Sequence, residues 1–362
     1  MQINPLDPVL AYERLRPEYA RFTQKLDVLC RELLKAKAID FHLLESRTKE
    51  ISSLRDKINR PDKSYTNPLA EITDFAGLRI ITYYQDAANE VAKLIGAEFQ
   101  VDQDNSVIHS SSAAEFGYKS AHFVIKLNPV RTTLLEWHGF SEFSAEIQVR
   151  TVLQHAWAAI SHKLQYKREE DVPAALKRKL FRLSALFELA DDEFVSLRDA
   201  SGQVTKEISD LFTKGERQLA IDYVSLSKLI DASPVVPEIC DYAAKVGFDF
   251  NYGSSFDEEE SRDTLSDLIQ LSGIAGIYTI EDFERILESA LPWVKDYLDA
   301  QYNADRKATG RWHVTPPFVC ELVLIGASVR NLQVDHLLQI GFHPSIGERV
   351  YNVAVKFDTT KT

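Results

Sequence analysis

Several features that would assign this chain to a common class are missing from its sequence. Its three cysteines, Cys30, Cys240 and Cys320, lie far apart and form no C-x-x-C pair, which argues against a zinc module and fits a reducing cytoplasm. No run of about 18 apolar residues occurs, so we expect no membrane span. The first residues lack a basic segment followed by an apolar one, so we expect no secretory signal. These absences together predict a cytoplasmic protein.

The length and charge of the chain suit two domains of different character. A chain of 362 residues is long enough for two domains with sizeable cores. Its net charge of −12 is uneven: residues 1–200 carry 27 Lys and Arg against 29 Asp and Glu, whereas residues 201–362 carry 15 against 25. A nearly neutral first half can concentrate positive charge in a cleft for polyphosphate. The acidic second half should repel nucleic acid; it either aids solubility or faces a basic surface.

The pattern of apolar residues divides the chain into a mixed first part and a helical second part. In the first part we expect helices over 8–38, 40–59, 86–95, 151–167 and 174–200 and strands over 77–84, 122–127 and 143–149. The polar, breaker-rich stretch 102–114 predicts a loop. In the second part we expect helices over 218–231, 235–246, 261–271 and 280–302, with 318–324 as either helix or strand. The sequence thus predicts an α/β domain over 1–212, with a mixed sheet flanked by helices, and a mainly helical domain over 213–362.

A basic cluster precedes the first expected strand. On the expected helix, Lys49, Ser53 and Lys57 follow one another at four-residue steps and share a face, with Arg47 beside them. Cations and a hydroxyl in one stripe can hold phosphate oxygens. The alternative is a solvated basic helix face.

Two acidic residues accompany apolar strands. Asp74 precedes one strand and Glu146 lies within another, where an unpaired carboxylate is costly. Both would be accommodated by Mg²⁺, which takes one or two carboxylates together with substrate phosphates. The alternative is that they form structural ion pairs with Arg79 and Arg150.

An exposed aromatic residue and two histidines complete the candidate set. Tyr118 follows Gly117 in a loop, where its ring could stack on a base or fill the start of a strand. His155 and His162 share one side of a helix but have no third ligand at suitable spacing, so we do not expect zinc. One of them could orient a carboxylate or phosphate, and Trp157 is most simply a core residue.

Taken together, these clusters resemble the RelA/SpoT synthetase family, the alarmone synthetases. The resemblance covers about residues 40–200 and rests on five motifs: Arg47-x-Lys49 with Ser53 and Lys57; Asp74-x-x-Gly77-x-Arg79-Ile80; Gly117-Tyr118-Lys119-Ser120-x-His122; Glu146-Ile-Gln148-Val-Arg150-Thr151; and Trp157 with His162 and Tyr166-Lys167. It implies a nucleotidyltransferase-like fold, a mixed sheet flanked by helices.

The resemblance also implies an activity and its residues. The family transfers the β,γ-pyrophosphate of ATP to the ribose 3′-hydroxyl of GTP or GDP, giving (p)ppGpp and AMP. By resemblance, Asp74 and Glu146 are the catalytic Mg²⁺ ligands, and Glu146 also draws the proton from the 3′-hydroxyl. The implied ATP-binding residues are Arg47, Lys49, Ser53, Lys57 and Arg79. The implied acceptor-binding residues are Tyr118, which would stack on the base, Lys119, His122, Gln148 and Arg150.

One departure from the family pattern keeps a second acceptor open. The family commonly carries a basic residue and an asparagine just before Gly-Tyr, whereas this chain reads Ala113-Ala114-Glu115-Phe116. The loss of a cation favours a toxin-like relative that pyrophosphorylates the 3′-terminal adenosine of tRNA. A catalytically inactive nucleotide-binding regulator is a third reading, against which the retention of both acids counts.

The segments outside the resemblance carry no motif of their own. About 40 residues precede it, without a His-Asp pair in a helical setting, so we expect no hydrolase domain of the kind that multidomain relatives carry. The helical second half could regulate the synthetase or bring copies together as a homo-oligomer.

Overall fold

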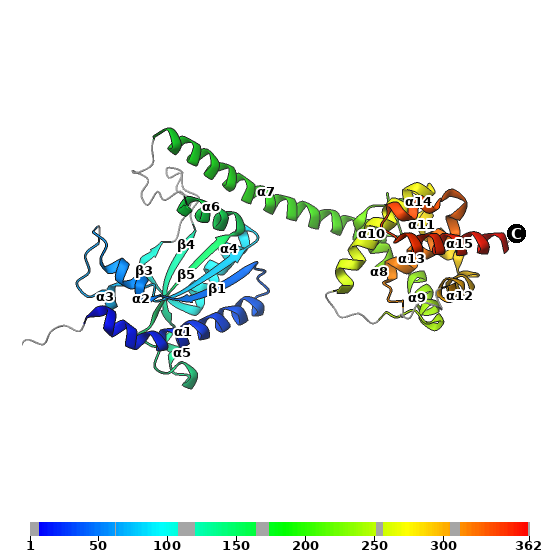
Figure 1. Cartoon of the computed structure of the whole chain (residues 1–362). Coiled ribbons are helices and arrows are strands. Elements are labelled where there is room, and N and C mark those ends of the chain that lie inside the picture. Colours follow the sequence, from blue (N-terminus) through cyan, green and yellow to red (C-terminus); the bar gives the residue numbers. More distant parts are fainter. Residues whose placement is uncertain are drawn as a thin grey trace, which may run out of the picture. The chain divides into compact units, whose positions relative to one another are not determined.

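The computed structural model describes residues 7–61, 63–107, 120–163, 174–250, 256–304 and 312–360. The chain divides into two compact units, residues 1–200 and 201–362 (Figure 1). Helix α7 (Ala174–Thr213) continues through this division without a break. The division falls between Ala200 and Ser201; the domain boundary that we placed at residue 213, where α7 ends, stays a prediction.

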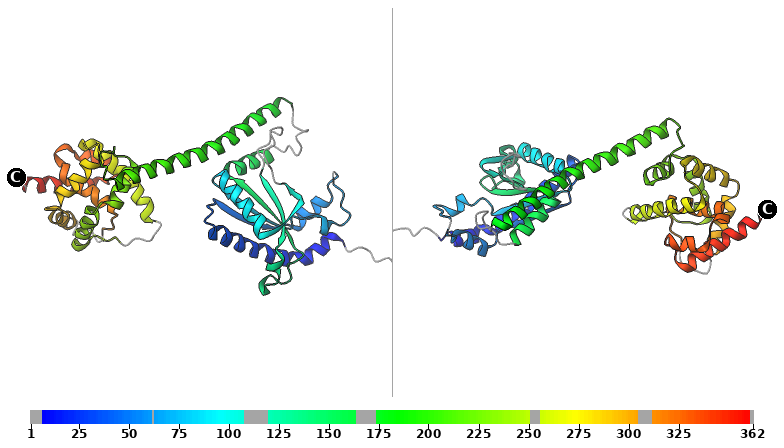
Figure 2. Two further views of the ribbon diagram at one scale, coloured as in Figure 1. Left: turned by 180° about the vertical axis from the view of Figure 1, so that it is seen from behind. Right: turned by 90° about the horizontal axis from the view of Figure 1, so that it is seen from above.

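A five-stranded mixed sheet forms the centre of the first unit, as predicted (Figures 1 and 2). Its strands are β1 (Leu43–Thr48), β2 (Ala76–Thr82), β3 (Phe99–Val107), β4 (Ala121–Leu127) and β5 (Ser144–Thr151). They lie in the order β1-β2-β5-β4-β3. Strands β2 and β5 are parallel, and the other neighbouring pairs are antiparallel.

Helices pack against the apolar residues of this sheet. The helical segments of the first unit are α1 (Pro8–Ala36), α2 (Ile51–Ile58), α3 (Pro68–Glu71), α4 (Gln85–Glu98), α5 (Pro129–Thr132), a 3₁₀ turn η1 (Leu135–Trp137), and α6 (Val152–Lys163). Asp7 caps the start of helix α1, and its side chain accepts a hydrogen bond from the Val9 N–H. Its residues Phe22 and Leu26, at a four-residue step, join one core with Val91 of α4 and Ile147 of β5. This core occupies the side of β5 opposite to its polar residues.

Two expectations for the first unit were wrong. Residues 40–59 do not form one helix: residues 43–48 form β1, and α2 begins only at Ile51. Edge pairing explains this, because β1 supplies hydrogen bonds to the side of β2 that β5 leaves free, with Leu44 opposite Ile80. Residues 102–107 of the expected loop belong to β3, where the Val124 N–H donates to Ser106 Oγ across an irregular register. Residues 108–114 of that loop lie outside the described residues.

The second unit is mainly helical, as predicted, and has its own core. Its segments are α8 (Tyr223–Ala232), α9 (Val235–Val246), α10 (Phe256–Ala275), α11 (Ile280–Ala290), α12 (Val294–Ala304), α13 (Pro316–Ser328), a 3₁₀ turn η3 (Val329–Asn331), α14 (Val334–Gln339) and α15 (Pro344–Thr360). Residues 318–324, ambiguous in the sequence, belong to the almost wholly buried α13. The expected helix 280–302 is two helices, interrupted at residues 291–293, which include Pro292. In the described part of the chain, no helix is both long and apolar enough to span a membrane.

Candidate active site

The candidate site lies on the polar face of the sheet. Burial alternates along β5: Ala145, Ile147 and Val149 are buried in the core, while the polar residues between them are half-buried. The register then aligns polar residues across strands. Arg47 of β1 lies opposite Gly77 of β2, which lies opposite Glu146 of β5. In the next row, Glu45, Arg79 and Gln148 are aligned in the same way.

These rows border a cavity of about 220 Å³. Its lining residues are Glu45, Ser46, Arg47, Asp74, Gly77, Leu78, Arg79, Glu146 and Gln148. Five residues that we had assigned to the site from the sequence therefore meet at one cavity, although they come from three strands and a loop: Arg47, Asp74, Arg79, Glu146 and Gln148.

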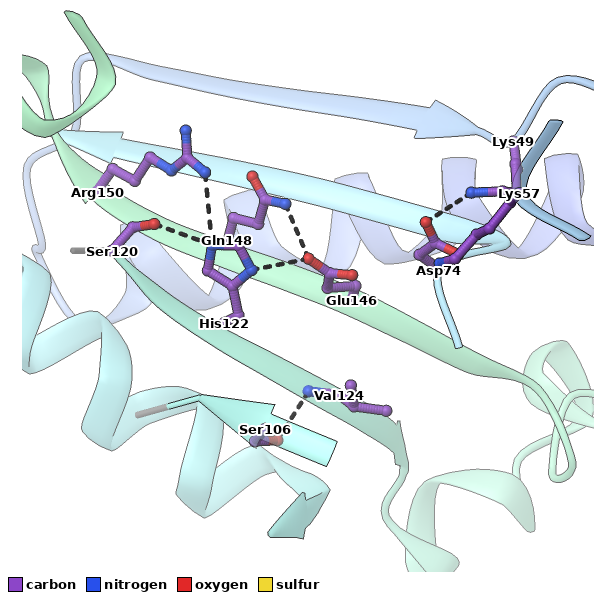
Figure 3. A network of polar contacts seen from close by, with 10 residues as sticks. All are labelled: Lys49, Lys57, Asp74, Ser106, Ser120, His122, Val124, Glu146, Gln148 and Arg150. Carbon is purple, nitrogen blue, oxygen red and sulfur yellow. Dashed lines mark hydrogen bonds and ion pairs between the residues drawn. The ribbon is translucent and has the colours of Figure 1, made fainter. Parts of the chain in front are cut away.

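Asp74, just before β2, is held by two lysines (Figure 3). Lys49 Nζ lies 2.6 Å from its Oδ2, and Lys57 Nζ lies 2.9 Å from its Oδ1. Burial would raise the pKa of Asp74, but the hydrogen bonds and charges of Lys49 and Lys57 outweigh it and hold the pKa below its usual value. Asp74 is therefore ionised at neutral pH.

Our prediction that the two lysines share a helix face was wrong. Lys49 follows β1 and precedes the first residue of α2, whereas Lys57 is near the end of α2. They converge because β1 and α2 approach Asp74 from different directions. Ser53 is exposed on α2, one turn before Lys57. Burial lowers the pKa of Lys49, against the opposing effect of Asp74.

Glu146 is oriented by two neighbours on the sheet (Figure 3). His122 Nδ1 lies 3.0 Å from Glu146 Oε1, and Gln148 Nε2 donates to the same oxygen at 2.8 Å. Arg150 Nη2 lies 3.4 Å from His122 Nε2. Because arginine can only donate, this contact assigns the His122 proton to Nδ1, which faces Glu146. The hydrogen bond from His122, opposed by burial and helped by Gln148, lowers the pKa of Glu146 below its usual value.

Two arginines add positive charge that is only partly balanced. Arg79 pairs with Glu45 at 3.1 Å. Burial and the charge of Arg79 lower the pKa of the Arg150 guanidinium. Within the described residues, Nε of Arg79, Nε of Arg150 and Oε1 of Gln148 are buried without a hydrogen-bond partner. Buried polar atoms are rarely left unpaired in folded proteins, so these groups suit a bound polar ligand.

The structural ion pairs that we had considered as an alternative are not formed. Asp74 pairs with Lys49 and Lys57 rather than with Arg79, and Glu146 contacts His122 rather than Arg150. Glu45 was missed by the sequence reasoning because its segment was interpreted as helix. A strand predicted over this segment would have revealed Glu45, because residues two apart on a strand share a face and Glu45 lies two residues before Arg47.

Of the remaining candidate residues, the structure describes two and leaves two outside the described residues. Tyr118 and Lys119 lie outside the described residues. In the part of the chain that the structure describes, the buried Nδ1 of His155, on α6, has no hydrogen-bond partner. Burial, followed by the charges of Arg79 and Arg150, lowers the pKa of His155. Trp157 packs on Phe187 of α7 with ring centroids 5.8 Å apart; it is half-buried and lies outside the core of the sheet, so the expected core role was wrong.

The donor set at the cavity fits Mg²⁺. Asp74 and Glu146 are both ionised, both line the cavity, and the charge of Asp74 acts on Glu146 by raising its pKa. Among the described residues, no group of three or more His, Cys, Asp or Glu side chains could hold a metal ion. Two carboxylates nevertheless suffice for Mg²⁺ when substrate phosphates supply further oxygens.

Comparison with known proteins defines the class to which this fold and site belong. Residues 46–171 match the model described as the region found in RelA / SpoT proteins. GTP pyrophosphokinase YjbM of Bacillus subtilis (strain 168) is 34% identical over 157 residues, which cover 42% of this chain and 69% of the relative. GTP pyrophosphokinase YwaC of the same organism is 28% identical over 158 residues, covering 42% and 72%. The chain therefore belongs to the RelA/SpoT family.

Among solved structures, the crystal structure of small alarmone synthetase 1 from Bacillus subtilis is similar to this chain. It is 25% identical, covers 53% of this chain and 98% of its own, and has a TM-score of 0.44.

Proposed function

We propose that the first unit transfers the β,γ-pyrophosphate of ATP to the ribose 3′-hydroxyl of GTP or GDP, giving (p)ppGpp and AMP. Family membership makes the chain an enzyme of the GTP diphosphokinase type. The observation that carries the proposal is the convergence of two ionised carboxylates, Asp74 and Glu146, with the cations Lys49, Lys57 and Arg79 at one face of the sheet. Pyrophosphate transfer needs anionic metal ligands and cations together.

In the proposed reaction, the acceptor 3′-oxygen attacks the β-phosphorus of ATP. The bond from the β-phosphorus to the oxygen shared with the α-phosphate breaks, and AMP leaves with that oxygen. The proton of the 3′-hydroxyl passes to Glu146. The His122 and Gln148 contacts fix Oε1 of Glu146, so its other carboxylate oxygen can face the acceptor. Positioned proton transfer of this kind contributes roughly 10²–10⁴-fold to rate.

The ATP side is assigned to the residues around Asp74. Lys49 and Lys57 each hold one carboxylate oxygen of Asp74 and retain further N–H groups for phosphate oxygens. Arg79 offers its unpaired Nε, and Arg47 lies in the adjacent row of the sheet. Ser53 is exposed one turn from Lys57. Mg²⁺ held by Asp74 and Glu146 would neutralise phosphate charge during transfer.

The acceptor side is assigned to the polar residues that follow Glu146 along β5 and to their neighbour on β4. His122, Gln148 and Arg150 extend from Glu146 along β4 and β5. The unpaired Nε of Arg150 and Oε1 of Gln148 are the groups that an acceptor can satisfy. Tyr118 and Lys119 are assigned here by family resemblance.

The sequence before Tyr118 supports a second acceptor, the 3′-terminal adenosine of tRNA. Ala113 and Ala114 provide no cation, and Glu115 adds a negative charge, which disfavours an acceptor that carries a 5′-polyphosphate. The transferred group and the attacked bond are the same for both acceptors.

The choice is tested by incubating the chain with ATP labelled in the γ-phosphate and GTP, GDP or deacylated tRNA. Label in a guanosine nucleotide supports the main proposal, and label at the tRNA 3′ end supports the second. Label in no acceptor, at an enzyme concentration where YjbM transfers it, would contradict both. The Glu146→Gln variant serves as the blank for contaminating kinases.

A further inference from the structure

The first turns of α1 contact the segment that carries Lys49. The Tyr12 hydroxyl donates to the main-chain carbonyl of Lys49 at 2.7 Å, and Arg16 Nε donates to the same oxygen at 3.2 Å. Arg16 also pairs with Glu50, the residue after Lys49, at 2.5 Å. Lys49 Nζ in turn lies 2.6 Å from Asp74 Oδ2 (Figure 3). A side chain of α1 therefore bonds directly to the backbone of a lysine assigned to ATP.

Phe75 connects Tyr12 to the other partner of this ion pair. The rings of Tyr12 and Phe75 are stacked, with centroids 4.6 Å apart and planes inclined by 28°. Phe75 follows Asp74 directly, and its carbonyl accepts a hydrogen bond from the Lys49 N–H at 2.8 Å. Tyr12 thus contacts the backbone of Lys49 through its hydroxyl and the neighbour of Asp74 through its ring. One side chain holds the backbone at both ends of the Lys49–Asp74 pair.

Burial keeps the Tyr12 hydroxyl in this hydrogen bond. Tyr12 is fully buried, and a buried hydroxyl that loses its partner is destabilised. Burial also raises the pKa of Tyr12 to about 12, so the hydroxyl keeps its proton and donates at neutral pH. The other donor, Arg16, is partly exposed and shared with Glu50. Of the two donors, Tyr12 is therefore the firmer constraint on Lys49.

On the basis of the proposed function, in which the Lys49 ammonium bonds to Asp74 and to phosphate oxygens of ATP together, we propose that Tyr12 is a positioning residue that acts through Lys49. An ammonium with two anionic partners tolerates little displacement, and a misplacement of about 1 Å caused by a distant mutation can cost about 10²-fold in rate. The Lys49 side chain is only 10% exposed, so the surrounding packing limits its ability to compensate for a shifted backbone.

The proposal is tested by titrating the full chain with AMPCPP in the presence of Mg²⁺. This ATP analogue carries a methylene group in place of the oxygen between the α- and β-phosphates, so it cannot undergo the proposed transfer. Tyr12→Phe keeps the ring that stacks on Phe75 and removes only the hydroxyl. It should raise the dissociation constant of AMPCPP by about 5–10-fold, as expected for one lost hydrogen bond. In steady-state assays the KM of ATP should rise while the KM of the acceptor stays unchanged.

Tyr19→Phe is the matched control. Tyr19 is also a buried residue of α1 and packs on Phe75, with ring centroids 5.1 Å apart. In the part of the chain that the structure describes, however, the Tyr19 hydroxyl does not bond to Lys49, whose carbonyl accepts from Tyr12 and Arg16. Tyr19→Phe should therefore bind AMPCPP like the parent chain. Thermal melts should show that both variants are folded at the assay temperature.

A double-mutant cycle separates positioning from a general loosening of the site. If Tyr12 acts through Lys49, Tyr12→Phe should change AMPCPP binding by less than about twofold in a Lys49→Met background, but by its full factor in a Lys57→Met background. A loosened site would instead lose affinity in every background, and the KM of the acceptor would rise together with that of ATP. The two KM values give the same decision where Lys49→Met binds too weakly to titrate.

The role of Tyr12 and the proposed function fail in different ways. A parent chain that does not bind AMPCPP would contradict the proposed ATP site and the role of Tyr12 with it. A parent chain that binds AMPCPP, together with a Tyr12→Phe variant that binds it equally well, would overturn only the role of Tyr12. Equal losses in Tyr12→Phe and Tyr19→Phe, or in the parent and Lys49→Met backgrounds, would assign the effect to the packing of α1 and also overturn it.

Discussion

Replacing Glu146 by glutamine is the most informative single change at the site. Glutamine has nearly the same shape as glutamate and keeps an oxygen that can accept a hydrogen bond from Gln148 Nε2. In the parent chain this nitrogen lies 2.8 Å from Glu146 Oε1. It removes the negative charge that His122 and the proposed metal use. The variant therefore separates the chemistry of the carboxylate from its packing.

The expected effect on the reaction rate and the expected effect on the stability of the fold are measured separately. If Glu146 accepts the 3′-hydroxyl proton and binds the metal, its loss should slow transfer by about 10²–10⁴-fold, which corresponds to about 3–5 kcal/mol in the barrier. The folded state loses one charge-assisted hydrogen bond, that from His122, worth about 1.5–3 kcal/mol at most. Part of that is retained, because glutamine still offers an oxygen to His122.

The assay is the initial rate of AMP release with saturating ATP and acceptor, together with a thermal melt. Glu142→Gln is the matched control, because Glu142 precedes the same strand and its side chain is 87% exposed; it should leave rate and melting temperature unchanged. A folded Glu146→Gln protein that keeps more than a tenth of the parent rate would refute the assignment of Glu146 to the reaction.

Three further predictions follow from the same geometry. Asp74→Asn should abolish transfer and also destabilise the fold by about 1–3 kcal/mol, because it leaves the buried ammonium of Lys49 without its charged partner. Adding Lys49→Met removes that unpaired charge and should recover part of the stability but no activity. Recovery of activity would show that Asp74 only balances the lysines. Tyr118→Ala should raise the acceptor KM by about 5–150-fold, equivalent to about 1–3 kcal/mol of stacking, without changing ATP binding, whereas Tyr118→Phe should be nearly silent; equal damage from both would point to the hydroxyl instead of the ring. The pKa values of Asp74 and Glu146 in the folded state lie below their usual values, so both acids stabilise the fold above an unfolded pKa of about 4 and lose that contribution as pH falls through the folded pKa. The melting temperature of the double variant Asp74→Asn/Glu146→Gln should therefore fall less on acidification than that of the parent chain. Parallel curves of melting temperature against pH would contradict the lowered pKa values.

The sequence indicated which residues belong to the candidate site better than it indicated which strands and helices bring them together. Glu146, Gln148 and Arg150 alternate with Ala145, Ile147 and Val149, and this period of two shows one polar and one apolar face without any tertiary information. Asp74 was found because it stands just before an apolar strand, whereas Arg79, in the middle of that strand, was assigned from the family motif. Of these residues, Asp74, Arg79, Glu146 and Gln148 line the cavity and Arg150 does not; their roles in the reaction stay predictions.

The basic cluster shows where local pattern fails. Leu44, Ile51, Leu54 and Ile58 recur at three-, four- and seven-residue steps, which mimics a helix that in fact starts only at Ile51. The strand before it forms because β2 has an open edge, and an open edge depends on the order of strands in the sheet. The convergence of Lys49 and Lys57 on Asp74 is likewise tertiary, so the sequence could indicate the charges but not their common partner.

The measurement that tests the central claim most directly is the fate of each phosphorus of ATP. Two parallel reactions, one with α-labelled and one with β-labelled ATP, are run with the acceptor that the chain prefers. Attack at the β-phosphorus predicts that the β label appears in the acceptor product and the α label in AMP, in equal amounts. If the α label entered the acceptor, or the β label appeared only as ADP or free phosphate, the chain would not be a pyrophosphokinase.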